Sequence, residues 1–340
     1  MSQSLYRAYR PATFAEVRGQ EQVTNALQEA IASGKVGHAY LFAGSRGLGK
    51  TSIARIFANE LKVSDKDLYE IDAASNTGVD NIRSLNENVH TLPFESPYKF
   101  YILDEAHMLS KSAWNALLKT LEEPPPYIVF VLATTEATKV PETVLSRCQV
   151  FEFKKPAREG LAKLVLDVSK KEGYTVDPSA ADLIALLAEG SYRDALSILE
   201  RVLSASSDKN VSRENAEKAT GAPKGALVEA LVRALSEGDK GAALVTVHTA
   251  EKQSVDMGLF LTLVTEYARN VLLVRHAPEL RADIQKELGE SYADVEAVAK
   301  AEGSKLTHKT LIALLDAASM LRYSPVPALP LELAIHGLSE

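Results

Sequence analysis

The sequence is poor in cysteine: Cys148 is the single cysteine among 340 residues, and there is also only one tryptophan. A lone cysteine can form neither an internal disulfide nor a cysteine-based zinc site. No stretch approaches 18 uninterrupted apolar residues, and the first residues lack the apolar segment of a secretory signal. We therefore expect a cytoplasmic protein that neither spans a membrane nor carries zinc.

The sequence also lacks an excess of positive charge. Its net charge is −7 and its pI is about 5.6, whereas a dedicated nucleic-acid binder is usually basic. A local basic surface stays compatible with this balance, because steering depends on where charges lie rather than on their sum. The length allows two or three domains, each with a core of its own.

Residues 38–153 alternate between short apolar runs and helix-like stretches. The predicted strands cover 39–43, 68–71, 100–103, 128–132 and 150–153, and the predicted helices cover 51–61, 79–89, 114–121 and 140–146, with Pro141 in the first turn of the last one. This alternation predicts an α/β domain with a mainly parallel sheet that helices cover on both faces. Ligands of such sheets bind beyond the carboxyl ends of the strands.

The strand pattern ends after about residue 156. Residues 157–220 read as short helices broken at Gly173, Pro178 and Gly190, and residues 221–340 read as a second helical block. Within this block, residues 260, 263, 264, 267 and 271 place apolar side chains on one helical face. We predict three domains, at 1–156, 157–220 and 221–340.

The segment after the first predicted strand matches the phosphate-loop pattern G-x-x-x-x-G-K-S/T. Its glycines let successive backbone N–H groups point at phosphate oxygens, and the following helix adds its positive N-terminal dipole. Lys50 should reach the β- and γ-phosphates, and the Thr51 hydroxyl should ligate magnesium. A chance match in a glycine turn would not need a strand before it and a helix after it, so the context favours a site for ATP and Mg²⁺ and an ATPase. The residues expected around the phosphates are Gly44, Ser45, Arg46, Gly47, Leu48, Gly49, Lys50, Thr51 and Ser52.

Two carboxylates follow the predicted strand 100–103. The strand end should bring Asp104 and Glu105 to the sheet edge that holds the phosphate loop. Asp104 is suited to hold magnesium, directly or through water, and Glu105 is suited to orient the attacking water. A solvated acidic strand end would look similar in isolation, but its pairing with the phosphate loop favours a catalytic site.

Three further polar residues have both a functional and an ordinary interpretation. Thr135, after the strand 128–132, could sense the γ-phosphate, although threonines also favour turns there. Arg147 is a candidate arginine finger for a neighbouring subunit, or else a surface ion pair. Arg193, at the start of a helix in the second predicted domain, is a candidate lid contact. From spacing alone, the ordinary interpretation is favoured for all three.

Other short motifs accompany these residues, at 9–11, 17–20, 38–42, 71–75, 103–109, 115–125, 133–135, 145–148 and 190–194. Together with the phosphate loop they resemble the clamp-loader family of AAA+ ATPases, in particular the γ/τ type of bacterial DNA polymerase III. The resemblance is dense over residues 5–200 and thinner beyond, where 329–334 resembles the C-terminal helix of the family. It implies an AAA+ P-loop ATPase domain, a small helical lid domain and an all-helical collar that holds subunits together.

The resemblance also implies a function and residue roles. The family forms a hetero-pentameric loader, with one or more copies of such a chain, that opens a ring-shaped sliding clamp and places it on primer–template DNA. In this family pattern Arg147 acts in trans as the arginine finger, Thr135 is a sensor and Arg193 is a lid sensor. Arg10, Pro11 and Val17 would border the adenine. The implied catalytic set is Glu105, Lys50, Arg147, Thr135 and Arg193.

The sequence departs from the family pattern in two places. The four-cysteine zinc module is missing, because residues 62–66 are all that separate the phosphate-loop helix from the second strand. The long τ extension that binds polymerase and helicase is also missing. The chain thus resembles a divergent or truncated γ-like subunit or a related loader such as replication factor C, and residues 133–135 favour the bacterial type.

Contact with DNA is a separate hypothesis. Ser75, Asn76, Thr77 and Arg83, around the helix after the second strand, are candidates for phosphate contacts. Each fits a solvated helix start equally well. Backbone contacts would make DNA binding fall with salt and be indifferent to sequence.

Three other functions compete with a clamp loader. A nucleic-acid helicase is suggested by residues 104–107, but that class needs a second α/β core, and residues 157–340 read as wholly helical. A scaffold that holds ATP without hydrolysis is opposed by the intact Lys50, Asp104, Glu105 and Arg147. Another AAA+ DNA remodeller, such as a branch-migration motor, would differ from a loader in needing no clamp.

Overall fold

The computed structural model describes residues 4–75, 79–206, 208–288 and 292–338. The chain forms two compact units. The first consists of Met1–Gly160 with Ala188–Ser197, and the second of Leu161–Leu187 with Ile198–Glu340. Each unit has its own apolar core.

The first unit is built on a parallel sheet of five strands. The strands are β1 (Ala39–Ala43), β2 (Leu68–Asp72), β3 (Lys99–Asp104), β4 (Ile128–Thr134) and β5 (Gln149–Glu152), in the spatial order β2-β3-β4-β1-β5. All neighbours are parallel, and Ala43 lies opposite Thr134 while Asp72 lies opposite Asp104. The carboxyl ends of the strands therefore meet at one edge, as the sequence predicts.

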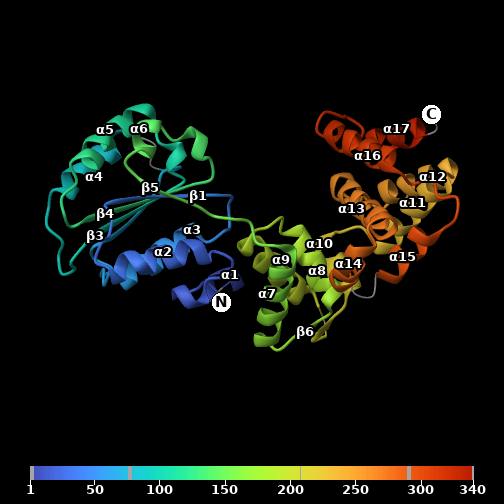
Figure 1. Cartoon of the computed structure of the whole chain (residues 1–340), viewed down its shortest axis with the longest axis horizontal. Coiled ribbons are helices and arrows are strands. Elements are labelled where there is room, and N and C mark those ends of the chain that lie inside the picture. The colour runs from blue at the N-terminus through green and yellow to red at the C-terminus, as the bar shows by residue number, and fades with distance from the viewer. Residues whose placement is uncertain (1–3, 76–78, 207, 289–291, 339–340) are drawn as a thin grey trace. The chain divides into compact units, whose positions relative to one another are not determined.

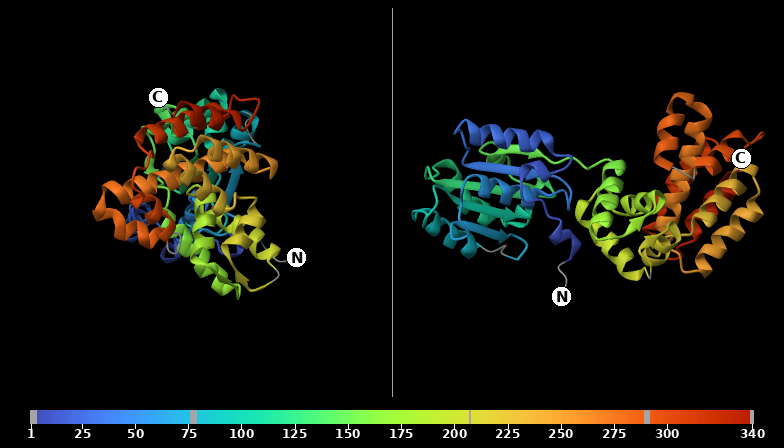
Figure 2. Two further views of the ribbon diagram at one scale, coloured as in Figure 1. Left: turned by 90° about the vertical axis from the view of Figure 1, so that its right-hand side faces the viewer. Right: turned by 90° about the horizontal axis from the view of Figure 1, so that it is seen from below.

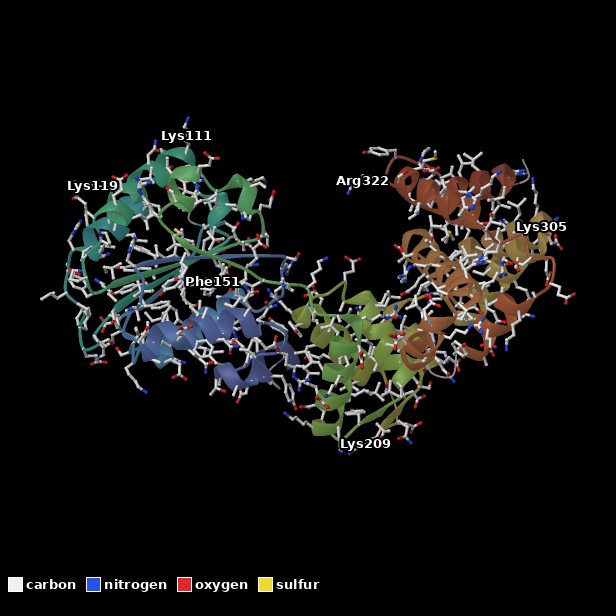
Figure 3. The ribbon with its side chains drawn as sticks, viewed as in Figure 1. Lys111, Lys119, Phe151, Lys209, Lys305 and Arg322 are labelled. Carbon is white, nitrogen blue, oxygen red and sulfur yellow. The ribbon has the colours of Figure 1, made fainter. Side chains whose placement is uncertain are left out.

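Helices cover both faces of this sheet (Figure 1 and Figure 2). On one face, α2 (Glu21–Ala32) and α3 (Lys50–Glu60) bury Leu27, Ile53 and Phe57 against strand residues such as Tyr40 and Phe42. On the other face, α4 (Val79–Val89) and α5 (Lys111–Glu122) pack against the alternate residues of the strands, among them Leu41 and Leu103. Lys111 and Lys119 are exposed on α5 (Figure 3). The short elements of this unit are α1 (Leu5–Ala8), α6 (Glu142–Leu145) and the 3-10 turns η1 (Phe14–Glu16), η2 (Ala106–Met108) and η3 (Ala137–Lys139).

The predicted strands and helices of this unit are confirmed to within a few residues. The helix predicted at 114–121 begins earlier, because the Ser110 side chain accepts the N–H of Ala113 and caps α5. The helix predicted at 140–146 is shorter than expected. Pro141 is the residue before its first turn rather than part of it.

The second unit is mainly helical. Its helices include α7 (Arg158–Lys171), α8 (Pro178–Leu187), α10 (Arg213–Thr220), α11 (Gly225–Glu237), α12 (Lys240–Lys252), α13 (Met257–His276), α14 (Arg281–Leu288), α15 (Tyr292–Lys300), α16 (His308–Leu321), α17 (Leu329–Gly337) and the turn η4 (Pro278–Leu280). The helix α9 (Tyr192–Ala205) begins in the segment that belongs to the first unit.

The prediction that residues 157–340 are wholly helical is wrong at one place. Two short strands, β6 (Thr175–Val176) and β7 (Asn210–Val211), pair in parallel. Val176 and Val211 lie opposite each other, and both are buried. Two residues are too few to give a strand periodicity in sequence.

The core of the second unit surrounds α13. Phe260, Val264 and Val271 are completely buried, which confirms the predicted apolar face. Among the described helices α13 has the length and composition of a membrane span, yet half of its apolar window is buried in this core. We assign it as the central helix of the unit. The division of residues 157–340 into a lid and a collar stays a prediction, because these residues fall largely in one unit.

Candidate nucleotide-binding site

The phosphate loop adopts a backbone that glycine permits. It runs from the end of β1 to the start of α3, and Gly47 and Gly49 have φ values of 77° and 91°. Residues with a Cβ rarely adopt this left-handed region. Gly49 precedes the first turn of α3, whose N–H groups have no partner within the helix and are available to an anion.

Lys50 lies inside the loop that precedes it. The residue is 6% exposed, and its Nζ donates to the carbonyl oxygens of Gly44 at 2.7 Å and Ser45 at 3.0 Å. Burial lowers the pKa of Lys50, and the nearby Glu105 and Asp104 carboxylates oppose that change. A buried ammonium group favours an anion beside it, because desolvation penalises an unpaired charge.

Thr51 and Asp104 bring two oxygen ligands together. The Thr51 hydroxyl donates to Asp104 Oδ2 at 2.8 Å, although the two residues lie 53 positions apart. The other oxygen of this carboxylate, Oδ1, accepts the Glu105 N–H at 3.0 Å. Carboxylate and hydroxyl oxygens are ligands that Mg²⁺ prefers, so the pair fits the predicted magnesium position.

Glu105 has an unusual backbone conformation for a residue with a side chain. Its φ and ψ are 49° and 43°, in the left-handed region. The Thr135 hydroxyl donates to Glu105 Oε2 at 3.0 Å. The structure thus joins the predicted water-orienting carboxylate to the predicted sensor, and local strain of this kind concentrates at functional sites.

The segment Ala188–Ser197 belongs to the first unit and packs on the phosphate loop. The Tyr192 N–H donates to the Gly47 carbonyl at 3.1 Å, and the Tyr192 hydroxyl donates to the Arg18 carbonyl at 2.8 Å. Arg193 follows, with its guanidinium 4.9 Å from the centre of the Tyr6 ring. The structure therefore brings Arg193 to the unit that holds the loop, but stacks it on Tyr6.

Gly47 shows how tight this contact is. A Cβ at this position would lie 1.9 Å from Ser191 Oγ. We expect Gly47→Ala to lower the free energy of unfolding of the first unit by at least about 1–2 kcal/mol, the cost of the left-handed backbone alone. ATP affinity should fall as well, since the loop and Ser191 must move apart. Urea denaturation and nucleotide titration measure the two effects.

Gly160→Ala is the matched control. Gly160 lies in α7, and a Cβ there would meet nothing within 4 Å. This change should stabilise the chain by roughly 0.5–1 kcal/mol, because alanine favours a helix. A Gly47→Ala protein as stable as the wild type would contradict the described packing.

The predicted adenine-bordering residues lie along α3 and the core. Arg10 Nε donates to Ser52 Oγ at 2.8 Å, so this arginine contacts the first turn of α3. Burial lowers the pKa of Arg10, and the Arg55 charge adds to that effect. Val17 packs against the core of the first unit and Pro11 is half-buried. Their role beside a base stays a prediction.

Arg147 is held within its own chain. Its Nη2 donates to Glu122 Oε1 at 2.7 Å, and its Nη1 donates to the Thr143 carbonyl at 2.7 Å and to Ser146 Oγ at 3.1 Å. Among the described residues these contacts lie on α5, α6 and the residue that follows α6. The structure does not bring Arg147 to the phosphate loop of its own chain, as a residue that acts in trans requires.

The proposed DNA contacts are only partly described. Ser75 is exposed, and its hydroxyl donates to Asp72 Oδ2 at 2.8 Å. Asn76 and Thr77 lie outside the described residues, as does the side chain of Arg83. Their role stays a prediction.

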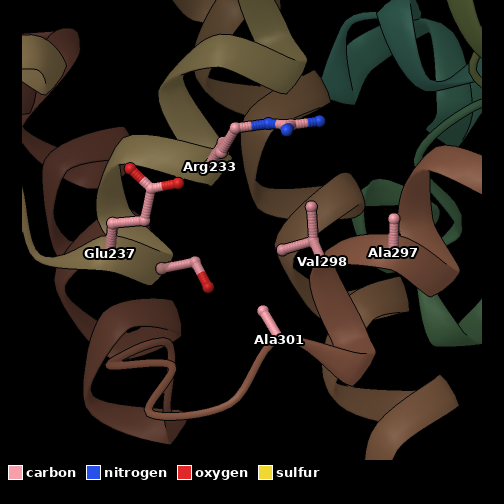
Figure 4. Close-up of a pocket in the computed structure, with 6 residues that line it drawn as sticks. Arg233, Glu237, Ala297, Val298 and Ala301 are labelled. Atoms are coloured by element: carbon pink, nitrogen blue, oxygen red, sulfur yellow. The ribbon is translucent and has the colours of Figure 1, made fainter.

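A small cavity in the second unit is separate from these residues. It has a volume of about 90 Å³ and is lined by Arg233, Ser236, Glu237, Ala297, Val298 and Ala301 (Figure 4). This space is far smaller than the roughly 300–1,000 Å³ of typical small-molecule sites. Within the described part of the chain, no group of three or more His, Cys, Asp or Glu side chains could hold a metal ion.

One polar residue of the site was missed by the sequence analysis. His107 lies in η2, and its Nδ1 is 3.4 Å from Glu105 Oε2. The sequence places His107 in the motif at 103–109, two residues from Glu105, but it does not show where the ring points.

Two family models match the chain. The model of the DNA polymerase III delta subunit matches residues 19–70 and 61–157. The model of the ATPase lid domain of the DNA polymerase III clamp loader subunit matches residues 162–208.

Curated relatives match most of the chain. DNA polymerase III subunit tau of Bacillus subtilis is 40% identical over 305 residues, which is 84% of this chain and 54% of the relative. Subunit tau of Escherichia coli is 38% identical over 297 residues, 81% of this chain and 46% of the relative. The chain spans about half the length of the curated relatives that it matches.

A solved structure shares the fold. The RuvB Holliday junction branch migration motor of Thermotoga maritima aligns with a TM-score of 0.54 and 21% identity, over 67% of this chain and 79% of that one. At this identity the likeness concerns the fold alone. The family models and the relatives together show that the chain is similar to the γ/τ clamp-loader subunits of bacterial DNA polymerase III, and its first unit has the fold of an AAA+ P-loop domain.

Proposed function

We propose that the chain is the ATP-hydrolysing motor subunit of a clamp loader. ATP binding and hydrolysis would drive the opening of a sliding clamp and its loading on primed DNA during replication. The observation that carries this proposal is the meeting of Lys50, the Thr51–Asp104 pair and the Glu105–Thr135 pair at one sheet edge. The similarity to γ/τ subunits supplies the biological setting.

Each residue has a defined task in this proposal. The loop amides and Lys50 hold the triphosphate, and Thr51 and Asp104 hold Mg²⁺, which would neutralise charge on the phosphates. Glu105 orients the attacking water through Oε1, the carboxylate oxygen to which Thr135 does not donate. Positioning and electrostatics of this kind supply most of the rate in phosphoryl transfer.

The remaining parts of the proposal concern partners. Arg147 would enter the site of a neighbouring subunit in a hetero-pentamer, and Arg193 would leave Tyr6 to contact bound nucleotide. The sliding clamp, primer–template DNA and the DNA polymerase III holoenzyme are the other partners, in the cytoplasm. The collar in residues 221–340 would join the subunits.

An ATPase assay on the reconstituted loader tests the proposal. We expect hydrolysis to rise several-fold when primed DNA and the sliding clamp are both present. Either component alone should give a smaller rise, because loading requires both. A rate that is the same with and without the clamp would contradict the proposal.

Other AAA+ remodellers are the second candidate. The chain shares its fold with a branch-migration motor, so the fold alone does not separate the two classes. Among loaders, a replication factor C-like small subunit is a further alternative. A motor of the branch-migration type would be stimulated by a four-way junction and not by the clamp. A helicase is disfavoured, because among the described residues the only strands of the second unit are the two-residue pair β6 and β7.

A further inference from the structure

His107 occupies a place in the site that neither the motifs nor the proposed function explain. Its side chain is 7% exposed although it carries two polar nitrogens. Nδ1 lies 3.2 Å from Thr134 Oγ1 and 3.4 Å from Glu105 Oε2, while Nε2 lies 3.4 Å from Glu136 Oε1. The ring is thus between the carboxylate after β3 and the carboxylate after β4.

We propose that His107 is a positioning residue, which helps Thr135 to hold the Oε2 atom of Glu105 and so fixes the carboxylate that orients the attacking water. The inference rests on the proposed ATPase function. In this proposal His107 contacts neither the nucleotide nor the attacking water. It sets the direction of Glu105, which orients that water.

The contacts of Glu105 Oε2 support this role. The Thr135 hydroxyl donates to this oxygen at 3.0 Å, and His107 Nδ1 lies 3.4 Å from it. Both contacts fall on the same oxygen, which leaves Oε1 as the oxygen that can accept from water. A carboxylate held through one oxygen cannot turn freely about its last bond, so its free oxygen keeps a fixed direction.

Thr134 anchors the ring itself. Thr134 Oγ1 accepts the Glu136 N–H at 3.0 Å and also faces Nδ1, and Thr134 is completely buried. Because a carboxylate accepts but does not donate, Nδ1 can hold Glu105 Oε2 only when this nitrogen carries the proton. The imidazole therefore couples the backbone turn after β4 to the orientation of Glu105.

The backbone of Glu105 explains why such a support is needed. Its left-handed conformation costs about 1–2 kcal/mol for a residue with a Cβ and persists only where the surroundings fix it. A misplacement of about 1 Å at a reacting group costs about 100-fold in rate. Loss of the ring would free the side chain without touching the phosphate loop or Lys50.

A double-mutant cycle in the reconstituted loader tests the inference. We expect His107→Ala to lower kcat about 10- to 100-fold while the affinity for ATP is unchanged. In a Glu105→Gln background the same change should have almost no further effect, because His107 acts through Glu105. Additive losses, or a parallel fall in ATP affinity, would overturn the inference in favour of a structural role.

Two conservative variants show which ring nitrogen of His107 supports Glu105. Asparagine places its amide where Nδ1 lies, and glutamine places its amide where Nε2 lies. We expect His107→Asn to recover more of kcat than His107→Gln, since Nδ1 is the atom that faces Glu105. Equal kcat values for the asparagine, glutamine and alanine variants would overturn the inference.

His248→Ala is the matched control. This histidine also lies beside a carboxylate, with Nδ1 3.6 Å from Glu251 Oε2, but its side chain is 60% exposed in the second unit. Its replacement should leave kcat unchanged, with assembly of every variant verified by gel filtration.

If the wild type hydrolyses ATP but its rate does not respond to clamp and DNA, the proposed function fails, while the double-mutant cycle still decides the role of His107. A wild-type assembly without turnover overturns both.

Discussion

Lys50→Ala is expected to abolish ATP hydrolysis by the assembled loader and to weaken ATP binding about 100-fold. The ammonium group is the buried cation of the phosphate loop, and a hydrogen bond to a charged partner contributes about 1.5–3 kcal/mol. A loss of about 3 kcal/mol corresponds to about two powers of ten in affinity. The nucleotide-dependent rise in thermal stability measures this directly.

The size of that rise follows from mass action. ATP at about 100 times its dissociation constant should stabilise the wild type by about 2.7 kcal/mol, and the variant should lose most of this. Lys35→Ala is the control, because Lys35 is exposed after α2 and has no role in the loop. An ATP-induced shift of Lys50→Ala equal to that of the wild type would show that the nucleotide binds elsewhere.

Arg147→Ala is expected to slow hydrolysis in the assembly by about 10³- to 10⁵-fold, the range for arginine fingers, while ATP affinity stays nearly intact. The arginine contacts Glu122 and the residues around α6 rather than its own phosphate loop. We therefore expect its charge to act on a nucleotide that another subunit holds. Single-turnover hydrolysis and equilibrium binding give the two quantities separately.

Arg233→Ala is the matched control for this prediction. Arg233 pairs with Glu229 at 2.6 Å on α11, much as Arg147 pairs with Glu122. The loss of an exposed ion pair changes stability by about 0–1 kcal/mol and should not change turnover. An equal loss of affinity and rate in Arg147→Ala would contradict a role in trans.

A mixture of Lys50→Ala and Arg147→Ala tests whether Arg147 acts on a neighbouring subunit. Lys50→Ala lacks a working phosphate loop but keeps its arginine, whereas Arg147→Ala keeps its loop but lacks the arginine. Where one assembly holds several copies of the chain, the mixture should hydrolyse ATP faster than either variant alone. Mixtures with no gain over the better variant would show that the arginine acts on its own subunit.

The sequence predicts much of the first unit because its signals are local. The five strands and the helices between them follow from apolar runs and helical spacing, and residues 44–51 carry their own motif. Parallel order then places Asp104 beside Thr51, since the carboxyl ends of neighbouring strands share an edge. This part of the site needs no knowledge of side-chain packing.

The rest depends on contacts between residues far apart in the chain. Ser191 packs against Gly47 although the two residues lie 144 positions apart (191 − 47). No local sequence pattern indicates that contact. The direction of the His107 ring depends on Thr134 and Glu136, which arrive from another strand. The strands β6 and β7 pair Val176 with Val211 although the two residues lie far apart in the chain, and both valines are buried.

The glycines of the phosphate loop and Thr135 show the difference between residues that a local motif explains and residues that only the fold explains. Gly47 and Gly49 are interpretable from sequence because the phosphate-loop motif fixes why a left-handed backbone is needed. Thr135 is ambiguous from sequence because threonines are common in turns. Its hydrogen bond to Glu105 becomes visible only when β3 and β4 lie side by side.

Calorimetric titration of ATP with Mg²⁺ into the purified chain is the most direct test of the central claim. The account predicts saturable binding of one nucleotide per chain, weakened about 100-fold by Lys50→Ala and unchanged by Lys35→Ala. It also predicts weaker binding when Mg²⁺ is removed, because Thr51 and Asp104, which lie within hydrogen-bond distance of each other, would hold the ion. A wild-type chain that binds no adenine nucleotide, or binds it equally well after Lys50→Ala, would contradict the account.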